Sequence, residues 1–157
     1  MIDKSKYDFE VKHLEFSKID EFLLIGTTIC CRAHFEKLIK AGMQADIDLQ
    51  EEKMDKPSGV TSFLWLPTVD FTPPSQAQLK IGSHFIKDLV SQKMKCYVHC
   101  NEGHGRAPTL VAAYYIYAHG LTPRQAVDRI KSKRPRANPN KKQMKALDIF
   151  YNKVHKR

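Results

Sequence analysis

The residues best suited to chemistry lie in the segment 99–106, which reads His-Cys-Asn-Glu-Gly-His-Gly-Arg. Cys100 offers a nucleophilic thiol, and Arg106 offers a forked guanidinium that can hold a phosphate through two parallel hydrogen bonds. The run before this segment is typical of a strand, and the run Pro108–Ala118 after it is typical of a helix. A loop at such a junction directs backbone N–H groups and the positive end of a helix dipole at one spot. The spacing therefore predicts a thiolate nucleophile aimed at a bound phosphate.

The loop after the cysteine supplies the remaining donors that a phosphoryl group needs. Backbone N–H groups would surround its equatorial oxygens, and two glycines let the chain curl around the anion. The expected phosphate-binding residues are Asn101, Glu102, Gly103, His104, Gly105 and Arg106.

Cleavage of a phosphate ester also requires an acid that protonates the leaving oxygen. Asp70 follows a predicted strand and precedes the stiff turn Thr72-Pro73-Pro74. Because the ends of parallel strands gather at one edge of a sheet, Asp70 is the expected acid. Asp46 and Asp48 lie inside a predicted strand and are less suitable. No histidine–carboxylate cluster with metal-ligand spacing is visible, so we expect catalysis without a metal or another cofactor.

Short apolar runs alternate with amphipathic segments, which predicts an α/β fold: a central, mostly parallel twisted sheet of about five strands flanked by helices. The expected strands are 22–25, 45–49, 62–66, 95–99 and one within Tyr7–Phe16. Helices are expected at 32–41, after Ser75, at 108–118, after Thr122 and from Asn138-Pro139 onward. Ser75 with Gln78 and Thr122 with Gln125 have the spacing of capping boxes.

The composition indicates one globular domain over residues 1–157. No signal peptide or membrane-spanning run is visible, so we expect a soluble, cytoplasmic and monomeric protein without membrane insertion. The net charge of +9 favours anionic partners. The densest basic stretch contains no aromatic residue, which argues against stable nucleic-acid binding. Cys30 and Cys31 follow Ile29, and we expect both to be buried.

The run HCNEGHGRAPT at 99–109 closely resembles the signature of dual-specificity protein tyrosine phosphatases, especially the small atypical members. The similarity extends across most of the chain, and the segments 19–26, 45–50, 66–74 and 120–140 each resemble a part of the family's fold. The resemblance implies that Cys100 is the nucleophile, Arg106 the phosphate clamp and Asp70 the acid and later the base. It also implies that His99 orients the loop, and that Asn140 supports it.

One position departs from the family pattern. Members usually carry Ser or Thr directly after the arginine, where the hydroxyl stabilises the departing thiolate, but this chain has Ala107. Either Thr109 or a backbone group compensates, or hydrolysis of the cysteinyl-phosphate is slowed.

The resemblance implies a phosphorylated protein or peptide as the substrate, with phosphotyrosine preferred over phosphoserine and phosphothreonine. Inositide-acting relatives tend to have lysines in the loop, and this loop has none. Two alternatives stay open. One is a phosphatase of a non-protein substrate, such as an RNA 5′ end, a phospholipid or a phosphoinositide. The other is a weakly active phosphopeptide-binding module, which Ala107 would favour.

Overall fold

The computed structural model describes residues 13–156 and contains five strands and five helices in that part of the chain. The strands are β1 (Phe16–Lys18), β2 (Leu23–Gly26), β3 (Met43–Gln50), β4 (Ser62–Thr68) and β5 (Lys95–His99). The helices are α1 (Arg32–Lys40), α2 (Gln76–Ser91), α3 (Arg106–His119), α4 (Pro123–Lys133) and α5 (Lys141–Val154). No helix among residues 13–156 is both long and apolar enough to cross a bilayer.

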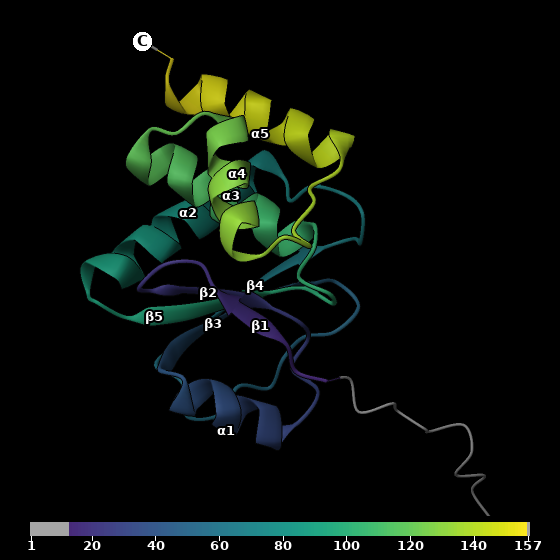
Figure 1. Ribbon diagram of the computed structural model, residues 1–157, viewed down its shortest axis with the longest axis vertical. Coiled ribbons are helices and arrows are strands. Elements are labelled where there is room, and N and C mark those ends of the chain that lie inside the picture. The colour runs from purple at the N-terminus through teal and green to yellow at the C-terminus, as the bar shows by residue number, and fades with distance from the viewer. Residues whose placement is uncertain (1–12, 157) are drawn as a thin grey trace, which may run out of the picture.

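The strands form one sheet in the order β1-β2-β5-β3-β4. Only the pair β1 and β2 is antiparallel, and the other neighbours are parallel. Helices cover both faces: α1 lies on one side, and α2, α3, α4 and α5 lie on the other (Figure 1). The predicted α/β class and mostly parallel sheet are therefore confirmed.

The centre of the domain is formed by β5 and α3. Both neighbours of β5 are parallel strands, and four of its five residues are buried, as expected for a strand covered on both faces. Helix α3 is buried from Arg106 to Ile116, because its sequence is apolar on nearly every side. A fixed strand and a fixed helix thus hold the two ends of the loop 100–105.

The capping signals in the sequence were reliable guides to helix starts. Ser75, Thr122 and Asn140 each begin a helix through a capping box with the glutamine three residues later. Helix α5 begins after Asn140, two residues later than Asn138-Pro139 suggested. Helix α3 begins at Arg106 rather than Pro108. The N–H groups of the first helical turn have no partner within the helix, so a proline, which lacks an N–H, is tolerated there.

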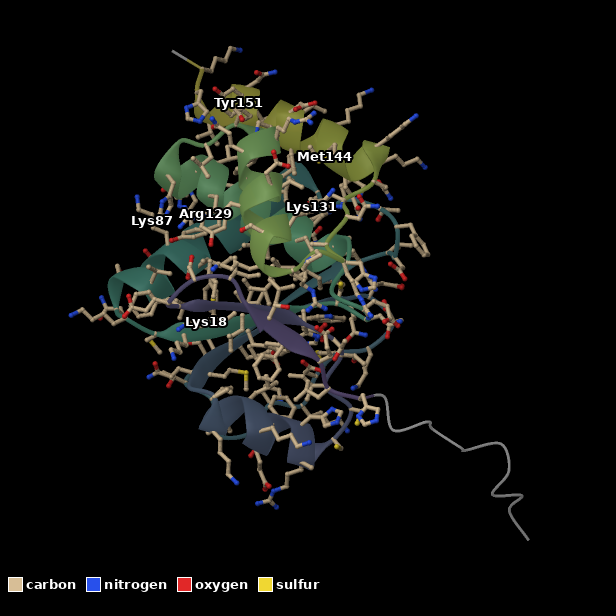
Figure 2. The ribbon with its side chains drawn as sticks, viewed as in Figure 1. Lys18, Lys87, Arg129, Lys131, Met144 and Tyr151 are labelled. Atoms are coloured by element: carbon tan, nitrogen blue, oxygen red, sulfur yellow. The ribbon has the colours of Figure 1, made fainter. Side chains whose placement is uncertain are left out.

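The predicted apolar face of α5 also forms. Leu147 is buried in the main core, and Met144, Tyr151 and Val154 are partly buried against it. Figure 2 shows Met144 and Tyr151 on different turns of this helix. The face closes the helical layer over α3, and this packing fixes the position of Asn140 at the start of α5.

Two sequence-based expectations need comment. Cys30 and Cys31 are exposed rather than buried, because they lie in the turn between β2 and α1 and only Ile29 packs into the core. The strand predicted within Tyr7–Phe16 falls mostly on residues outside the described range, and β1 begins at Phe16.

Candidate active site

The carboxyl ends of the parallel strands gather the candidate residues at one edge of the sheet. Cys100 follows β5, Asp70 follows β4 after one residue, and Glu52 follows β3 after one residue. This is the edge at which ligands bind in open α/β sheets. The structure therefore brings together Cys100 and Asp70, which are 30 positions apart in the sequence.

A pocket of about 280 Å³ lies at this edge. Its lining residues come from the acid loop after β4, the loop 100–105 and the segment that leads into α5. They are Asp70, Phe71, Cys100, Glu102, His104, Gly105, Asn138, Asn140 and Gln143. The Cys100 residue is only 3% exposed, so its thiol is accessible from the pocket and from little else.

Arg106 is 1% exposed and is held by several groups at once. Its Nη1 and Nη2 donate to the two carboxylate oxygens of Glu52 at 2.8 and 2.7 Å, and Nη1 also donates to the Thr68 carbonyl at 2.8 Å. Its Nε lies 3.4 Å from Asp70 Oδ1 and makes no hydrogen bond within the described residues. The guanidinium is thus fixed by its two terminal nitrogens, and the buried Nε keeps an unused hydrogen-bond donor beside Asp70.

The Glu52 contact keeps this pair charged. The hydrogen bond from Arg106 lowers the pKa of Glu52 to about 2. Burial works against the charge on Arg106, but Glu52 and the nearby Cys100 together raise the pKa of the guanidinium. Sequence reasoning missed Glu52, because a glutamate in a charged loop resembles an ordinary surface residue.

Arg134 braces the loop that follows Cys100. It is buried, and it donates from Nε to the Gly103 carbonyl at 2.9 Å and from Nη2 to the Glu102 carbonyl at 3.0 Å. Arg134 also donates from Nη1 and Nη2 to the two carboxylate oxygens of Glu15, at 2.7 and 2.8 Å. Because these carbonyls point toward Arg134, the loop is curled with a positive φ of 71° at Gly103. The sequence analysis did not single out Arg134 or Glu15.

Asn140 holds the acid loop rather than the loop after Cys100. Its Nδ2 donates to the Phe71 carbonyl at 2.8 Å, and Gln143 Nε2 donates to the Thr72 carbonyl at 3.2 Å. Both side chains belong to the capping box of α5. The start of α5 therefore fixes the segment that carries Asp70 over the pocket.

His99 lies in a buried cluster of carboxylates that the sequence did not reveal. Its Nε2 is 2.6 Å from Asp55 Oδ2, 3.2 Å from Asp46 Oδ1 and 3.9 Å from Asp48 Oδ1. All four side chains are fully buried. His99 Nδ1 also lies 3.3 Å from the Cys100 carbonyl. The predicted role of His99 in orienting the loop fits this contact. The pairing of β3 with β5 brings Asp46 and Asp48 to His99, and the loop after β3 brings Asp55.

This burial changes the protonation of the cluster. Loss of hydration raises the pKa of Asp46 to about 7 and that of Asp48 to about 6. For His99 the same loss opposes the charge, but hydrogen bonds to Asp46 and Asp55 outweigh it and raise its pKa well above the usual value. Burial also disfavours charge on Asp55, yet the His99 hydrogen bond lowers its pKa. The cluster holds His99 as a cation paired with Asp55.

Asp46→Asn is expected to flatten the dependence of stability on pH. A carboxyl whose pKa is raised in the folded state binds more protons there than in the unfolded chain, so its contribution falls as pH rises from about 4 to about 7. Between pH 5 and pH 8 the wild-type chain should therefore lose roughly 1–3 kcal/mol relative to the variant. Urea unfolding at the two pH values measures this difference. Asp88→Asn, on the surface of α2, is the matched control, and equal slopes for wild type and Asp46→Asn would refute the assignment.

The position after Arg106 is Ala107, which lacks a hydroxyl, and the hydroxyl of Thr109 is bonded to the backbone of the loop. Ala107 is buried, and Thr109 Oγ1 donates to the Gly105 carbonyl at 2.7 Å inside the first turn of α3. The Thr109 hydroxyl is thus used to hold the end of the loop.

Comparisons with known proteins agree with this geometry. A family model described as the catalytic domain of dual specificity phosphatases matches residues 28–153. The phosphatidylglycerophosphate phosphatase PTPMT2 of Arabidopsis thaliana is 31% identical over 142 residues, which are 86% of this chain and 62% of that protein. The phosphatidylglycerophosphatase and protein-tyrosine phosphatase 1 of Mus musculus is 28% identical over 150 residues, which cover 88% of this chain and 77% of that protein.

Solved structures give the same result. The crystal structure of PTPMT1 in complex with PI(5)P superposes with a TM-score of 0.80 at 26% identity, and the match covers 88% of this chain and 96% of that one. The crystal structure of DUSP15 has a TM-score of 0.77 at 28% identity, with 87% and 86% covered. The chain therefore belongs to the dual specificity phosphatase family.

Proposed function

We propose that this phosphatase hydrolyses the phosphomonoester of a phospholipid headgroup through a cysteinyl-phosphate intermediate. The thiolate of Cys100 attacks phosphorus, and the bond from phosphorus to the ester oxygen breaks. Asp70 gives its proton to that oxygen, which leaves as an alcohol. Asp70, now a carboxylate, takes a proton from a water molecule whose oxygen attacks the phosphorus. Inorganic phosphate departs and the Cys100 thiolate returns.

Arg106 and the loop provide the charge stabilisation in both steps. The Nε of Arg106 lies 3.4 Å from Asp70, which lines the pocket, while Glu52 holds the Nη1 and Nη2 groups. A guanidinium that is already fixed loses little freedom when the anion arrives, so its interaction favours the transition state. The same geometry lets Asp70 leave its 3.4 Å contact with Nε when a phosphate enters.

The observation that favours a lipid is the apolar rim beside Asp70. Val69 is 57% exposed and Phe71 is 75% exposed, and Phe71 lines the pocket that contains Cys100. Phe71 has a φ of 64°, a left-handed conformation that a bulky side chain adopts only under constraint. The hydrogen bond from Asn140 to its carbonyl supplies part of that constraint. An aromatic side chain that is exposed to solvent at the mouth of a pocket is suited to contact with a membrane surface.

Basic residues next to this rim fit an anionic bilayer. Arg136, Lys141 and Lys142 are exposed, and they flank the pocket residues Asn138 and Asn140. Each cation close to an anionic surface adds to the attraction. PTPMT2 of Arabidopsis thaliana and the similar mouse protein are named as a phosphatidylglycerophosphate phosphatase and a phosphatidylglycerophosphatase, which supports the same class of substrate.

Phe71→Ser tests this proposal with a matched control. The variant should lose about tenfold or more in kcat/KM on phosphatidylglycerophosphate in anionic vesicles, because it loses apolar contact area with the bilayer. It should keep its rate on p-nitrophenyl phosphate in solution. Ile81→Ser removes another exposed apolar side chain, 53% exposed, from α2 and should change neither rate. A Phe71→Ser variant with full activity on vesicles would overturn the membrane-facing role of the rim.

A protein substrate is the second candidate. The mouse relative is named as both a phosphatidylglycerophosphatase and a protein-tyrosine phosphatase, and DUSP15 is among the matched structures. The loop without lysines also favours groups with a single phosphate. Phosphotyrosyl peptide is therefore the second arm of the assay. A kcat/KM on peptide above that on lipid vesicles would favour this candidate.

Asp70→Asn should have an effect that depends on the leaving group. On an alkyl phosphate such as a lipid headgroup, kcat should fall by about 10²–10⁴-fold, because the alkoxide cannot leave without a proton. On p-nitrophenyl phosphate, whose phenolate leaves readily, the fall should be smaller. Steady-state rates on both substrates measure the difference. Equal losses on the two substrates, or none, would mean that Asp70 is not the acid.

A further inference from the structure

A second group of reactive side chains lies outside the active site, at the start of α1. Cys30 and Cys31 carry exposed free thiols, and His34 lies one helical turn further on. Cys30 Sγ is 3.7 Å from His34 Nε2. One ligand atom from each of the three residues lies within 4.8 Å of the other two. Nothing in the proposed phosphatase chemistry uses these groups.

The local structure explains why these side chains converge. Cys31 is the N-cap of α1 and His34 is the third residue of that helix. These two positions face each other across the first turn, as they do in the capping boxes of α2, α4 and α5. Here the pair is a thiol and an imidazole rather than a hydroxyl and an amide. Cys30, next in the chain, adds its sulfur to the same side.

The donor set and spacing suit a thiophilic cation. Two thiolates and one imidazole are preferred ligands of Zn²⁺, with bonds of about 2.3 and 2.0–2.1 Å. In a tetrahedral arrangement these bonds place sulfur and nitrogen ~3.6 Å apart. The observed 3.7 Å between Cys30 Sγ and His34 Nε2 matches that separation. We propose that Cys30, Cys31 and His34 form a binding site for a thiophilic divalent cation such as Zn²⁺ or Cd²⁺.

Exposure makes the two sulfurs available as ligands. Cys30 and Cys31 are both exposed, and binding of a divalent cation would displace the protons of their thiols. The Cys30 N–H donates to His34 Nδ1 in a long 3.4 Å contact, so binding of a cation through Nε2 requires the ring to carry its proton on Nδ1 and to give up that contact.

Lys53 is the nearby cation that would oppose metal binding. It lines the same cavity of about 480 Å³ as the two cysteines. Its ammonium donates to the Ile29 carbonyl, so part of its charge is directed at the backbone rather than at the thiols. When a divalent cation binds, it would displace the protons of both thiols, and the two sulfurs then supply the negative charge that the ion needs.

A disulfide between the two cysteines is a poor alternative. Their Cα atoms are about 3.8 Å apart across a trans peptide, which is shorter than the 4.4–6.8 Å usual for a disulfide. The pair therefore favours the dithiol form, which is the form that binds metals.

The site adjoins the segment that supports the loop after Cys100. Thr28, two residues before Cys30, donates its N–H to the Asn101 carbonyl at 3.0 Å and its hydroxyl to Gln50 Oε1 at 2.8 Å. A cation that bridges Cys30 to His34 would tie this segment to α1. Because the folded chain holds all three ligand atoms within 4.8 Å of one another, a cation should bind the folded chain more tightly than the unfolded chain and raise the melting temperature.

Cadmium titration of the full chain tests the proposal. Cys100→Ser serves as the parent protein, since it removes the active-site thiol. The parent should bind one equivalent with thiolate-to-cadmium charge-transfer absorption, and Zn²⁺ should compete for the site. Adding Cys30→Ser and Cys31→Ser should abolish the absorption, and His34→Gln should weaken binding at least tenfold. Adding Cys96→Ala, which removes a buried thiol on β5, should change neither the charge-transfer absorption nor the affinity for cadmium.

Two outcomes would overturn the metal site. One is the same charge-transfer titration with and without Cys30 and Cys31. The other is no such absorption in the parent with cadmium in excess. Both serine substitutions are at exposed positions, so the chain should fold, and a Zn²⁺-dependent rise in melting temperature that is lost in the double variant gives a second reading.

Discussion

Cys100→Ser is expected to lower kcat by at least ~10⁴-fold on lipid and aryl phosphates alike, since a lost nucleophile has effects of this order or larger. A serine hydroxyl remains protonated and is a much weaker nucleophile than a thiolate. Neither Arg106, which is a cation, nor His99, which is buried in its carboxylate cluster, is placed to deprotonate a serine at this position. The substitution changes one atom at a position that is 3% exposed, so the pocket should keep its shape and its affinity for inorganic phosphate.

Rapid-mixing kinetics and phosphate binding measure both parts of this prediction. Cys96→Ala is the matched control, because it removes another buried thiol from β5, the strand that leads into Cys100. That variant should retain kcat. Substantial turnover by Cys100→Ser would show that another residue is the nucleophile.

Arg106→Lys is expected to lower kcat/KM by about 10²–10³-fold, as the loss of an important transition-state donor does in other enzymes. Lysine offers a point charge instead of a planar fork, so it cannot keep both Glu52 oxygens and present an edge to the phosphate. It would also leave the Thr68 carbonyl without its buried donor. Both defects should weaken the stabilisation of the transition state more than they lower the stability of the fold.

Steady-state kinetics and the affinity for inorganic phosphate measure the Arg106 effect. Arg129→Lys is a control with the same chemical change. Arg129 lies over the Tyr115 ring, 4.4 Å from its centre, and Figure 2 shows it on α4. This variant should keep full activity. A similar kcat/KM in Arg106→Lys and wild type would remove Arg106 from the transition state.

The elements that position the nucleophile were predictable from local sequence. The alternation of short apolar runs with amphipathic segments indicated β5, and the long apolar run indicated the buried α3. Capping boxes marked the starts of α2 and α4. Each of these patterns involves residues that are close together in the sequence. It can therefore be recognised without knowledge of the tertiary structure, and here the local preference agrees with the fold.

The contacts that support the site were less visible, because they join residues far apart in the sequence. Asp55 lies 44 positions from His99, and Glu52 lies 54 positions from Arg106. Only the parallel pairing of β3 with β5 shows that Asp46 and Asp48 face His99. Burial of Cys30 and Cys31 was expected wrongly, because a neighbouring isoleucine says little about the direction of two residues in a turn.

The substrate class shows the same limit of sequence reasoning. The family resemblance favoured a phosphorylated protein and the loop composition favoured a single phosphate group, but the loop forms only the bottom of the pocket. The exposed rim of Val69 and Phe71 depends on the left-handed backbone at Phe71, which no local residue pattern predicts. That rim and the names of the relatives favour a phospholipid instead.

The most direct test of the account is to find the phosphoryl group on the protein during turnover. The wild-type chain is mixed with phosphatidylglycerophosphate vesicles, quenched within one turnover, digested and analysed by mass spectrometry. A phosphoryl group on the peptide that contains Cys100, absent from Cys100→Ser, is the predicted result. Release of inorganic phosphate from these vesicles while that peptide stays unmodified at every quench time would contradict the proposed mechanism.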